Sequence, residues 1–353
     1  MDVEKKRPGL SMKGTAVIVC AVLAAAAVFF AVDYYRTGRR YSSAGYAMGA
    51  VVTQNLEGRS AQETAAKILQ DITAAERKSL SRTAEGSDIY RINAAAGNIR
   101  TEVGADTAAR LTETLALCKA SSGALDITLG AVSDAWGIGT GARRVPPAGE
   151  IAALLRQTGY GKVRVEAAAV THPEGQSLDM GAIGKGIACD IAKDIAAANG
   201  IDKAVVSVGG SVMLYSSSDR ETFTVGIRNP DGTASEYMGI LTLKNGFVST
   251  SGNYEKYFEL GGKRYHHILD PATGYPADSG LTSVTVFCQS GLASDALSTA
   301  CFVLGYEKSL PLLEKYSAQA VFIGGDGKVC VTGGLKDLFK LTDERGFTLV
   351  DQL

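Results

Sequence analysis

An apolar run near the N-terminus, TAVIVCAVLAAAAVFFAV at residues 15–32, constrains the fold of this chain more than any other feature. No polar face interrupts the run, which argues against a buried core helix as its alternative. Its length of about 18 residues is near the lower limit for crossing the hydrocarbon core of a bilayer. We therefore expect a single membrane-spanning helix followed by a separately folded body.

Charged residues on either side of the run predict its orientation. Four basic residues precede it: Lys5, Lys6, Arg7 and Lys13. They predict a cytoplasmic N-terminus and place the bulk of the chain outside the cytoplasm. Arg36, Arg39 and Arg40 follow the run and weaken this asymmetry.

A cleaved signal peptide and a lipoprotein signal are the two other interpretations of the run. A cleavable signal needs small residues before the cut, and FFAVD at residues 29–33 does not supply them. A lipoprotein needs a small residue before Cys20, where Val19 stands. An uncleaved signal anchor fits best, which predicts a single-pass protein of the inner (cytoplasmic) membrane.

The chain then divides into a short polar tether and one long folded region. We expect a cytoplasmic tail and anchor over 1–32, a tether over 33–45 and a main domain over 46–350. Helical periodicity marks four long stretches of that domain: 61–80, 106–121, 184–199 and 293–304. Strands are expected over 47–56, 161–166 and 176–180, and then as a block of short strands through most of 203–287. Blocks of strands interleaved with long helices predict an α+β fold rather than a regular βαβ array.

Charge and cysteine content exclude some classes of function. Lys and Arg total 36 against 37 for Asp and Glu, so the basic surplus that nucleic-acid binding requires is absent. None of the six cysteines lies in a CxxC pair or at zinc-ligand spacing from a histidine. Most lie in apolar runs, which predicts small buried side chains, and a disulfide stays possible in an oxidising compartment.

A glycine-rich turn at 178–192, LDMGAIGKGIACDIA, is the first candidate for a binding site. A strand is expected to end at Asp179, and a helix to begin near Gly184 with Lys185 in its first turn. Small residues let backbone N–H groups approach an anion, and the helix N-terminus and the lysine both favour negative charge. The alternative is a turn that serves only packing.

The stretch ASDALSTACFVLG at 293–305 is the second candidate. Asp295 and Thr299 are four residues apart, so both project from one face of a helix. A carboxylate and a hydroxyl suit a hard cation such as Mg²⁺, with other ligands from carbonyls, water or phosphate. The alternative is that Asp295 or Ser294 caps the helix.

Two adjacent histidines, His266 and His267, precede the rigid turn DPATGYP at 270–276 and form the third candidate. Side chains alternate along a strand, so these two point to opposite faces and only one can face a given cleft. The alternative is a structural turn with one packed and one exposed histidine.

These stretches occur in an order that resembles the FAD:protein FMN transferases, the ApbE-type flavin transferase family. The resemblance covers about 48–305 and rests on these motifs: MG at 48–49, GALD at 123–126, DMGAIGKGIACD at 179–190, VSVGG at 206–210, STSGNYEKYF at 249–258, HILDPATGYP at 267–276 and ASDALSTACFVLG at 293–305.

The resemblance implies an α+β catalytic domain that cleaves FAD at its pyrophosphate. It implies transfer of FMN to a Thr or Ser hydroxyl of an acceptor protein through a phosphoester, release of AMP, and Mg²⁺ at the pyrophosphate. Residues implied as FAD contacts are Met48, Ala124, Leu125, Asp126, Asp179, Lys185 and Ile268. Implied metal ligands are Asp295, Thr299 and the backbone carbonyl of Ala182. His267 would be either the base for the attacking hydroxyl or a cofactor contact.

Two departures from the family pattern accompany these matches. Thr83 stands where relatives often have Tyr, which removes a stacking contact, and Leu125 replaces the usual Phe. Two other functions use the same residues: an FAD pyrophosphatase that transfers FMN to water, and a flavin-binding membrane protein without catalysis. The position outside the cytoplasm implies an acceptor that is a membrane-associated redox protein.

Overall fold

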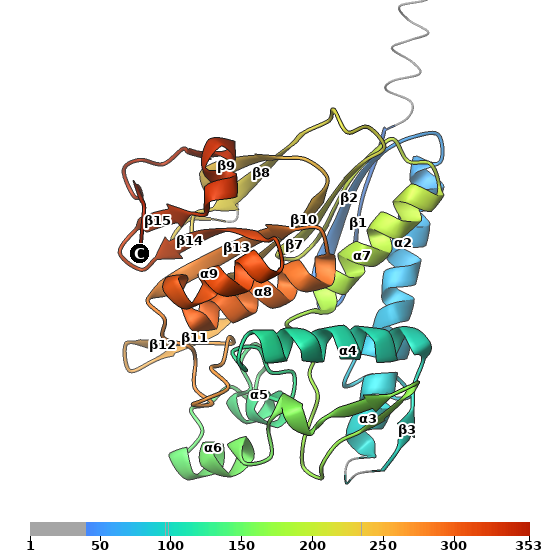
Figure 1. Cartoon of the computed structure of the whole chain (residues 1–353), viewed down its shortest axis with the longest axis vertical. Coiled ribbons are helices and arrows are strands. Elements are labelled where there is room, and N and C mark those ends of the chain that lie inside the picture. The colour runs from blue at the N-terminus through green and yellow to red at the C-terminus, as the bar shows by residue number, and fades with distance from the viewer. Residues whose placement is uncertain (1–39, 96, 98, 234) are drawn as a thin grey trace, which may run out of the picture.

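The computed structural model describes residues 40–95, 97, 99–233 and 235–353 (Figure 1). The expected cytoplasmic tail, the anchor at 15–32 and the first part of the tether lie outside these ranges. Within them, no helix combines the length and the apolarity needed to cross a bilayer.

A nine-stranded sheet forms the centre of the molecule, in the spatial order β1-β2-β6-β7-β10-β13-β14-β15-β17. Neighbouring strands are antiparallel except for β15 and β17, which are parallel. The strands are β1 (Arg40–Ala47), β2 (Ala50–Glu57), β6 (Lys203–Val208), β7 (Ser211–Ser216), β10 (Gly246–Gly252), β13 (Leu281–Cys288), β14 (Gln319–Gly324), β15 (Lys328–Val331) and β17 (Thr348–Val350).

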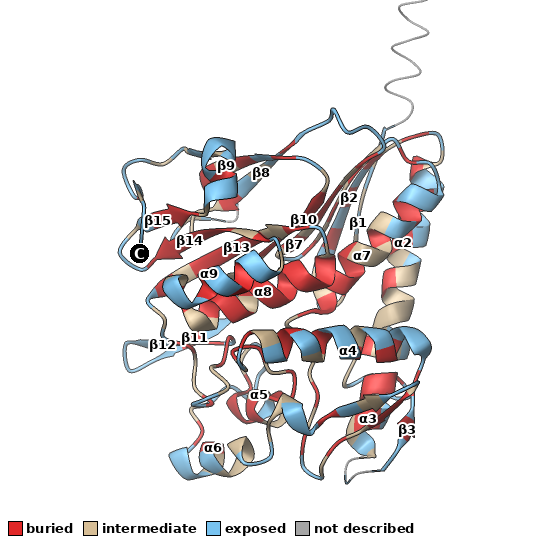
Figure 2. Ribbon diagram, viewed as in Figure 1, coloured by how far each residue is buried: buried red, intermediate tan, exposed pale blue. Residues whose placement is uncertain are grey.

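Long helices cover one face of this sheet (Figure 1). They are α2 (Ala61–Ala75), continued by a π-helical turn at Glu76–Leu80, and α7 (Gly184–Ala198), α8 (Gly291–Leu304) and α9 (Tyr306–Lys315). Helix α8 packs on β10 and β13 and is buried along most of its length, as Figure 2 shows. It begins where the Ser290 side chain accepts a hydrogen bond from the amide of Ala293.

A smaller sheet packs on the opposite face of the central sheet, in the order β16-β9-β8. Its strands are β8 (Phe223–Arg228), β9 (Tyr237–Leu243) and β16 (Phe339–Leu341), preceded by a 3₁₀ helix at Gly333–Leu338. Apolar residues of both sheets form one core between them, including Leu214, Val248, Leu241 and Ile323.

The remaining elements lie below α7 and α8 in Figure 1, with one helix, α4 (Ala105–Ala120), running beside α8. The other helices there are α3 (Asp88–Ala94), α5 (Gly130–Trp136) and α6 (Ala148–Leu155), with a 3₁₀ turn at Tyr160–Lys162. A three-stranded sheet consists of β3 (Thr101–Glu102), β5 (Ala169–Thr171) and β4 (Arg164–Glu166). A separate hairpin consists of β11 (Tyr257–Leu260) and β12 (Lys263–His266).

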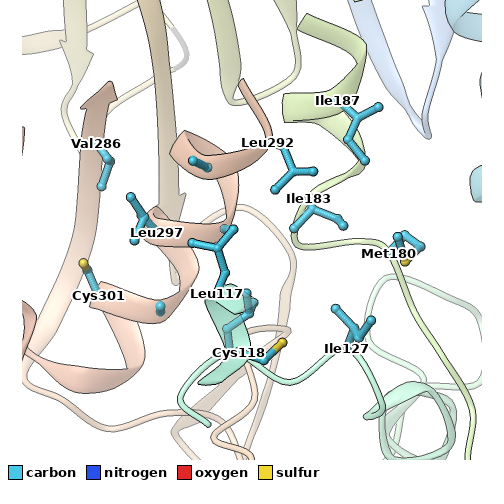
Figure 3. Packing of buried hydrophobic residues seen from close by; sticks show 14 of the residues in the cluster. Leu117, Cys118, Ile127, Met180, Ile183, Ile187, Val286, Leu292, Leu297 and Cys301 are labelled. Atoms are coloured by element: carbon cyan, nitrogen blue, oxygen red, sulfur yellow. The ribbon is translucent and has the colours of Figure 1, made fainter. Parts of the chain in front are cut away.

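One hydrophobic core joins this region to the helices on the sheet. In Figure 3, Leu117 and Cys118 of α4 lie near Ile183 at the start of α7 and Leu297 of α8. The mixed α and β body expected from the sequence is therefore confirmed. The five described cysteines are all buried and free, as their apolar surroundings predict, and burial raises the pKa of the Cys118 thiol to about 12.

Two local expectations were wrong, and one strand was missed. Residues 40–45, expected in the tether, belong to β1, a sheet-edge strand whose exposed face carries polar residues that hide its strand character. Residues 176–180 form no strand beyond a bridge between Ser177 and Leu129, because the chain there turns toward α7. Strand β5 at Ala169–Thr171 was not expected, since three residues carry too short a pattern to detect.

Candidate active site

A pocket of about 820 Å³ opens where α7, α8, the β1–β2 turn and the strand segment after β12 meet. Its walls include ten of the eleven predicted site residues: Met48, Ala124, Leu125, Asp126, Asp179, Ala182, Lys185, His267, Ile268 and Thr299. The eleventh, Asp295, is 2% exposed and lies beneath Lys185 rather than on the wall. The structure thus gathers side chains from segments far apart in the sequence.

Met48 enters this pocket from a tight hairpin turn between β1 and β2. Both turn residues, Met48 and Gly49, have positive φ angles of 55° and 66°. A non-glycine residue in this region is strained and needs support from its surroundings. The carboxylate of Glu76 provides it by accepting a hydrogen bond of 2.9 Å from the Met48 amide.

Asp126 braces the wall formed by the loop after α4. Its Oδ1 accepts hydrogen bonds from the amide and hydroxyl of Thr128, at 2.8 and 2.6 Å. Its Oδ2 accepts from the amide of Tyr160 at 3.1 Å. The carboxylate therefore holds two loops together at the pocket edge, and Ala124 and Leu125 are buried just before it.

The glycine-rich turn forms the floor of the pocket, with the expected helix start. Asp179 closes the turn by accepting a hydrogen bond of 2.8 Å from the amide of Gly181. Helix α7 begins at Gly184, so Lys185 stands in its first turn with a side chain that is 28% exposed. The positive end of the helix dipole beside an ammonium group makes a favourable site for phosphate oxygens.

Two glycines allow α7 and α8 to cross at backbone contact next to this floor. A Cβ atom on Gly186 would lie 2.1 Å from the Gly291 carbonyl oxygen, and one on Gly291 would lie 2.3 Å from the Gly186 carbonyl oxygen. No side chain fits at such distances, so the close crossing depends on glycine at both positions.

Carboxylates lock this crossing in both directions. Asp190 of α7 accepts hydrogen bonds from the amides of Gly291 and Leu292 in α8, at 2.7 and 2.8 Å. Asp295 of α8 accepts from the amide of Gly186 in α7 at 2.9 Å. The sequence argument missed Asp190, although it closes the quoted motif DMGAIGKGIACD.

Asp295 lies in a buried network of hydroxyl groups. Ser211 donates to its Oδ1 at 3.2 Å, and Ser249 links Ser211 to Ser294 at 3.1 and 2.8 Å. Thr299, one turn along α8, lines the pocket, and its hydroxyl lies 3.2 Å from that of Ser251. The described residues contain no cluster of three His, Cys, Asp or Glu side chains suited to a metal.

His267 faces the pocket, while His266 faces the core, as the alternation along the strand predicts. His266 is buried, and its Nε2 donates to the carbonyl of Ala277 at 3.1 Å. The His267 ring is open to the pocket and its Nδ1 lies 3.2 Å from the carbonyl oxygen of Lys256. The surrounding protein removes water from around the ring, and this loss of hydration is the main reason that the pKa of His267 is lowered to about 4. The positive charge of Lys185 is the second cause.

The DPATGYP turn holds the segment that carries His267. Asp270 closes the turn with two hydrogen bonds. Its backbone carbonyl accepts one from the amide of Gly274 at 2.7 Å, and its carboxylate accepts one from the amide of Ala272 at 2.9 Å. The indole of Trp136 donates to the Gly274 carbonyl at 2.8 Å. The turn is thereby anchored to α5 at the far side of the pocket, which fixes the strand end at Ile268.

Arg82 is a pocket residue that the sequence argument did not identify. Its guanidinium pairs with both carboxylate oxygens of Asp134 on α5, at 2.5 and 2.8 Å, and lies 3.3 Å from Asp179. The hydrogen bonds to Asp134 raise the pKa of Arg82. A single arginine in a polar loop gives no local signal, because its two partners are distant in sequence.

The charges on the pocket wall constrain what can bind there. The described wall residues include three cationic side chains, Arg82, Lys185 and Lys256, and four acidic ones, Asp126, Asp134, Asp179 and Glu255. A polyanionic ligand therefore needs cationic help beyond that supplied by the wall itself.

A lysine at a helix N-terminus, a neutral histidine and a nearby buried carboxylate are compatible with binding and reaction of a phosphate group. Comparisons with known proteins identify the kind of enzyme. Residues 48–323 match the model of the ApbE family. The chain belongs to the ApbE family, which confirms the resemblance seen in its motifs.

Relatives with known names match the chain along most of its length. An FAD:protein FMN transferase of Treponema pallidum is 33% identical over 328 residues, covering 87% of this chain and 91% of the relative. One of Klebsiella pneumoniae is 31% identical over 317 residues, covering 89% and 98%.

Two solved structures have the same fold. The ApbE protein of Thermotoga maritima superposes with a TM-score of 0.79 at 31% identity, covering 85% of this chain and 99% of that one. The apo flavinyl transferase ApbE of Pseudomonas stutzeri superposes with a TM-score of 0.75 at 29% identity, covering 86% and 98%.

Proposed function

We propose that this chain is an FAD:protein FMN transferase, as its named relatives are, and that the pocket described above is its active site. FAD is cleaved at its pyrophosphate, FMN is joined to a Thr or Ser hydroxyl of an acceptor protein, and AMP leaves. The observation that carries the proposal is the single pocket where Lys185, at the start of α7, and His267 line the same space.

His267 is suited to act as the base. The Lys256 carbonyl can only accept a hydrogen bond, so Nδ1 of His267 carries the proton and Nε2 keeps a free lone pair. A pKa of about 4 leaves that nitrogen unprotonated at neutral pH. As the acceptor oxygen bonds to the FMN phosphorus, its proton passes to Nε2, and the bond from phosphorus to the AMP-side oxygen breaks.

Lys185 and the positive end of the α7 dipole bind and orient the phosphates. They place positive charge where the pyrophosphate oxygens gain negative charge in the transition state. Arg82 lies on the wall of the same pocket and keeps Asp134 and Asp179 paired, which limits their repulsion of the substrate.

Mg²⁺ fits the oxygen donors that α8 and the α7 turn offer. The carboxylate of Asp295, the hydroxyl of Thr299 and the carbonyl of Ala182 are hard ligands of the kind that Mg²⁺ takes together with phosphate oxygens. The excess of acidic over basic side chains on the wall supports a bound cation. When bound, the ion neutralises charge on the pyrophosphate.

Incubation with FAD, Mg²⁺ and candidate membrane redox proteins tests the function. In-gel flavin fluorescence of the acceptor together with released AMP supports transfer. AMP with free FMN and no labelled acceptor supports the pyrophosphatase instead, and neither product supports a flavin carrier. In the transfer assay, His267→Ala is expected to lower the rate by about 10²–10⁴-fold while FAD still binds.

The proposed location rests on the sequence of the segment before the described residues. The run at 15–32 and the basic residues before it favour an inner-membrane anchor with the catalytic domain outside the cytoplasm. The acceptor would then be an outward-facing protein of the same membrane. Protease added to intact spheroplasts is expected to digest the body, and full protection would exclude this topology.

A further inference from the structure

The ammonium group of Lys185 lies against the carboxylate that is the expected metal ligand. Its Nζ is 3.5 Å from Oδ1 of Asp295 and 3.4 Å from the carbonyl oxygen of Gly181. The Asp295 side chain is 3% exposed. The ammonium group therefore has oxygen neighbours of the kind that a divalent cation prefers.

The remaining contacts of this carboxylate come from neutral groups. The amide of Gly186 donates to one oxygen at 2.9 Å and the hydroxyl of Ser211 donates to the other at 3.2 Å. Among the described residues, Lys185 is the cationic partner of Asp295. A buried carboxylate left without a counter-ion is strongly destabilising, so this charge pair stabilises the Asp295 side chain in its buried position.

We propose that Lys185 occupies the cation position of Asp295 in the metal-free protein and leaves it when Mg²⁺ and FAD bind together. This inference rests on the function proposed above. Two cations on one carboxylate oxygen repel each other strongly in a partly buried site, so Mg²⁺ binding displaces the ammonium. The Lys185 side chain is 28% exposed on a flexible stem and lines the pocket, where the pyrophosphate can receive it.

Coupling between metal and flavin follows from this exchange. Without FAD, Mg²⁺ competes with Lys185 and binds weakly. With FAD, the ammonium group of Lys185 binds the phosphates and Mg²⁺ binds more tightly. Linkage then requires that Mg²⁺ increase the affinity for FAD by the same factor.

The Lys185→Met variant tests the competition between Lys185 and Mg²⁺ in the absence of FAD, so that the result does not depend on phosphate binding. We expect the variant to bind Mg²⁺ alone, measured by calorimetry without FAD, about tenfold more tightly than the wild type, because its competitor is gone. Lys256→Met is the matched control: it removes another lysine of the pocket wall and should bind Mg²⁺ alone within about twofold of the wild type. Adding Asp295→Asn to Lys185→Met should abolish the gain.

Equal or weaker Mg²⁺ binding by folded Lys185→Met would overturn the proposal. If that variant folds only when Mg²⁺ is added, the ion has replaced the missing counter-ion and the proposal stands; if it stays unfolded at saturating Mg²⁺, the proposal fails. Lys185→Arg keeps the charge, and tenfold tighter Mg²⁺ binding by this variant would also contradict it. Failure of the wild type to flavinylate any acceptor would count against the proposed function and leave these binding results unchanged.

Discussion

The carbonyl oxygen of Lys256 accepts two hydrogen bonds from His267, one from its amide at 3.0 Å and one from its Nδ1 at 3.2 Å. One backbone atom thus fixes both the position of the residue and the tautomer of its ring. The free Nε2 is left to face the pocket. A histidine held in this way serves as a base without needing a carboxylate partner.

The pKa of His267 predicts an unusual pH profile. The residue titrates near 4 rather than at the ordinary value of about 6.5. Flavin transfer by the wild type should therefore stay near its maximum from pH 7 down to about pH 5 and fall by half near pH 4. Initial rates of transfer across this range test it, and a half-maximum near pH 6.5 would contradict the assigned role.

Stability should change with pH in the same window. A histidine whose pKa is lower in the folded state binds fewer protons there than in the unfolded chain between about pH 4 and 6.5. The contribution of neutral His267 to the free energy of unfolding is therefore fully present above about pH 6.5 and declines as the pH falls toward 4. The urea midpoint should drop less over this range for His267→Gln than for the wild type.

Asp295→Asn should abolish Mg²⁺-dependent turnover while keeping the fold. The amide has the same shape and can still accept from the Gly186 amide, but it lacks the charge that a cation requires. We expect loss of Mg²⁺-dependent turnover with a near-native circular dichroism spectrum. Wild-type turnover at limiting Mg²⁺ would show that Asp295 only joins the two helices.

Gly186→Ala should destabilise the protein by about 1–3 kcal/mol, the typical cost of forcing extra volume into a packed core. Its Cβ would lie 2.1 Å from a backbone oxygen that cannot move aside without separating α7 from α8. Gly184→Ala, two residues earlier in the same helix, meets nothing within 4 Å and is the control for stability. Equal urea midpoints for the two variants would contradict the close crossing.

Asp190→Asn should weaken the response to Mg²⁺ as well as the fold, although Asp190 is not on the described pocket wall. The change removes an acceptor for the first amides of α8 and shifts the helix that carries Asp295, at a cost of about 1–3 kcal/mol. Asp88→Asn is a matched control, because Asp88 is also buried and accepts from the amide of Gly104 at 3.0 Å.

The two variants should lose comparable stability in urea denaturation. A calorimetric titration with Mg²⁺ and FAD should then show weaker metal binding for Asp190→Asn and an unchanged value for Asp88→Asn. An equal loss of Mg²⁺ affinity in both variants would mean that Asp190 affects metal binding only through the general stability of the fold.

Arg82→Met should weaken FAD binding by about tenfold. The substitution keeps an unbranched side chain but removes the guanidinium, which leaves Asp134 and Asp179 without this partner beside an anionic substrate. The loss should shrink as salt is raised, because screening reduces the repulsion. Fluorescence titration with FAD at low and high salt measures both effects, and an unchanged affinity at low salt would remove Arg82 from the site.

The sequence by itself determined the parts of the site that depend on local pattern. The start of α7 after a glycine-rich turn, the opposite faces of His266 and His267, and the rigid DPATGYP turn all follow from periodicity and turn chemistry within a few residues. Motif order was enough to indicate the family, because each motif is a short contiguous string.

Tertiary structure alone decided how these parts act on one another. Asp190 reaches an amide 101 residues away, Arg82 reaches Asp134 across the pocket, and Lys185 rests on an Asp295 that lies below the wall. Such pairs leave no local pattern, because packing rather than chain neighbourhood brings them together. The sequence could name a lysine and a carboxylate, but only the crossing of α7 and α8 places one against the other.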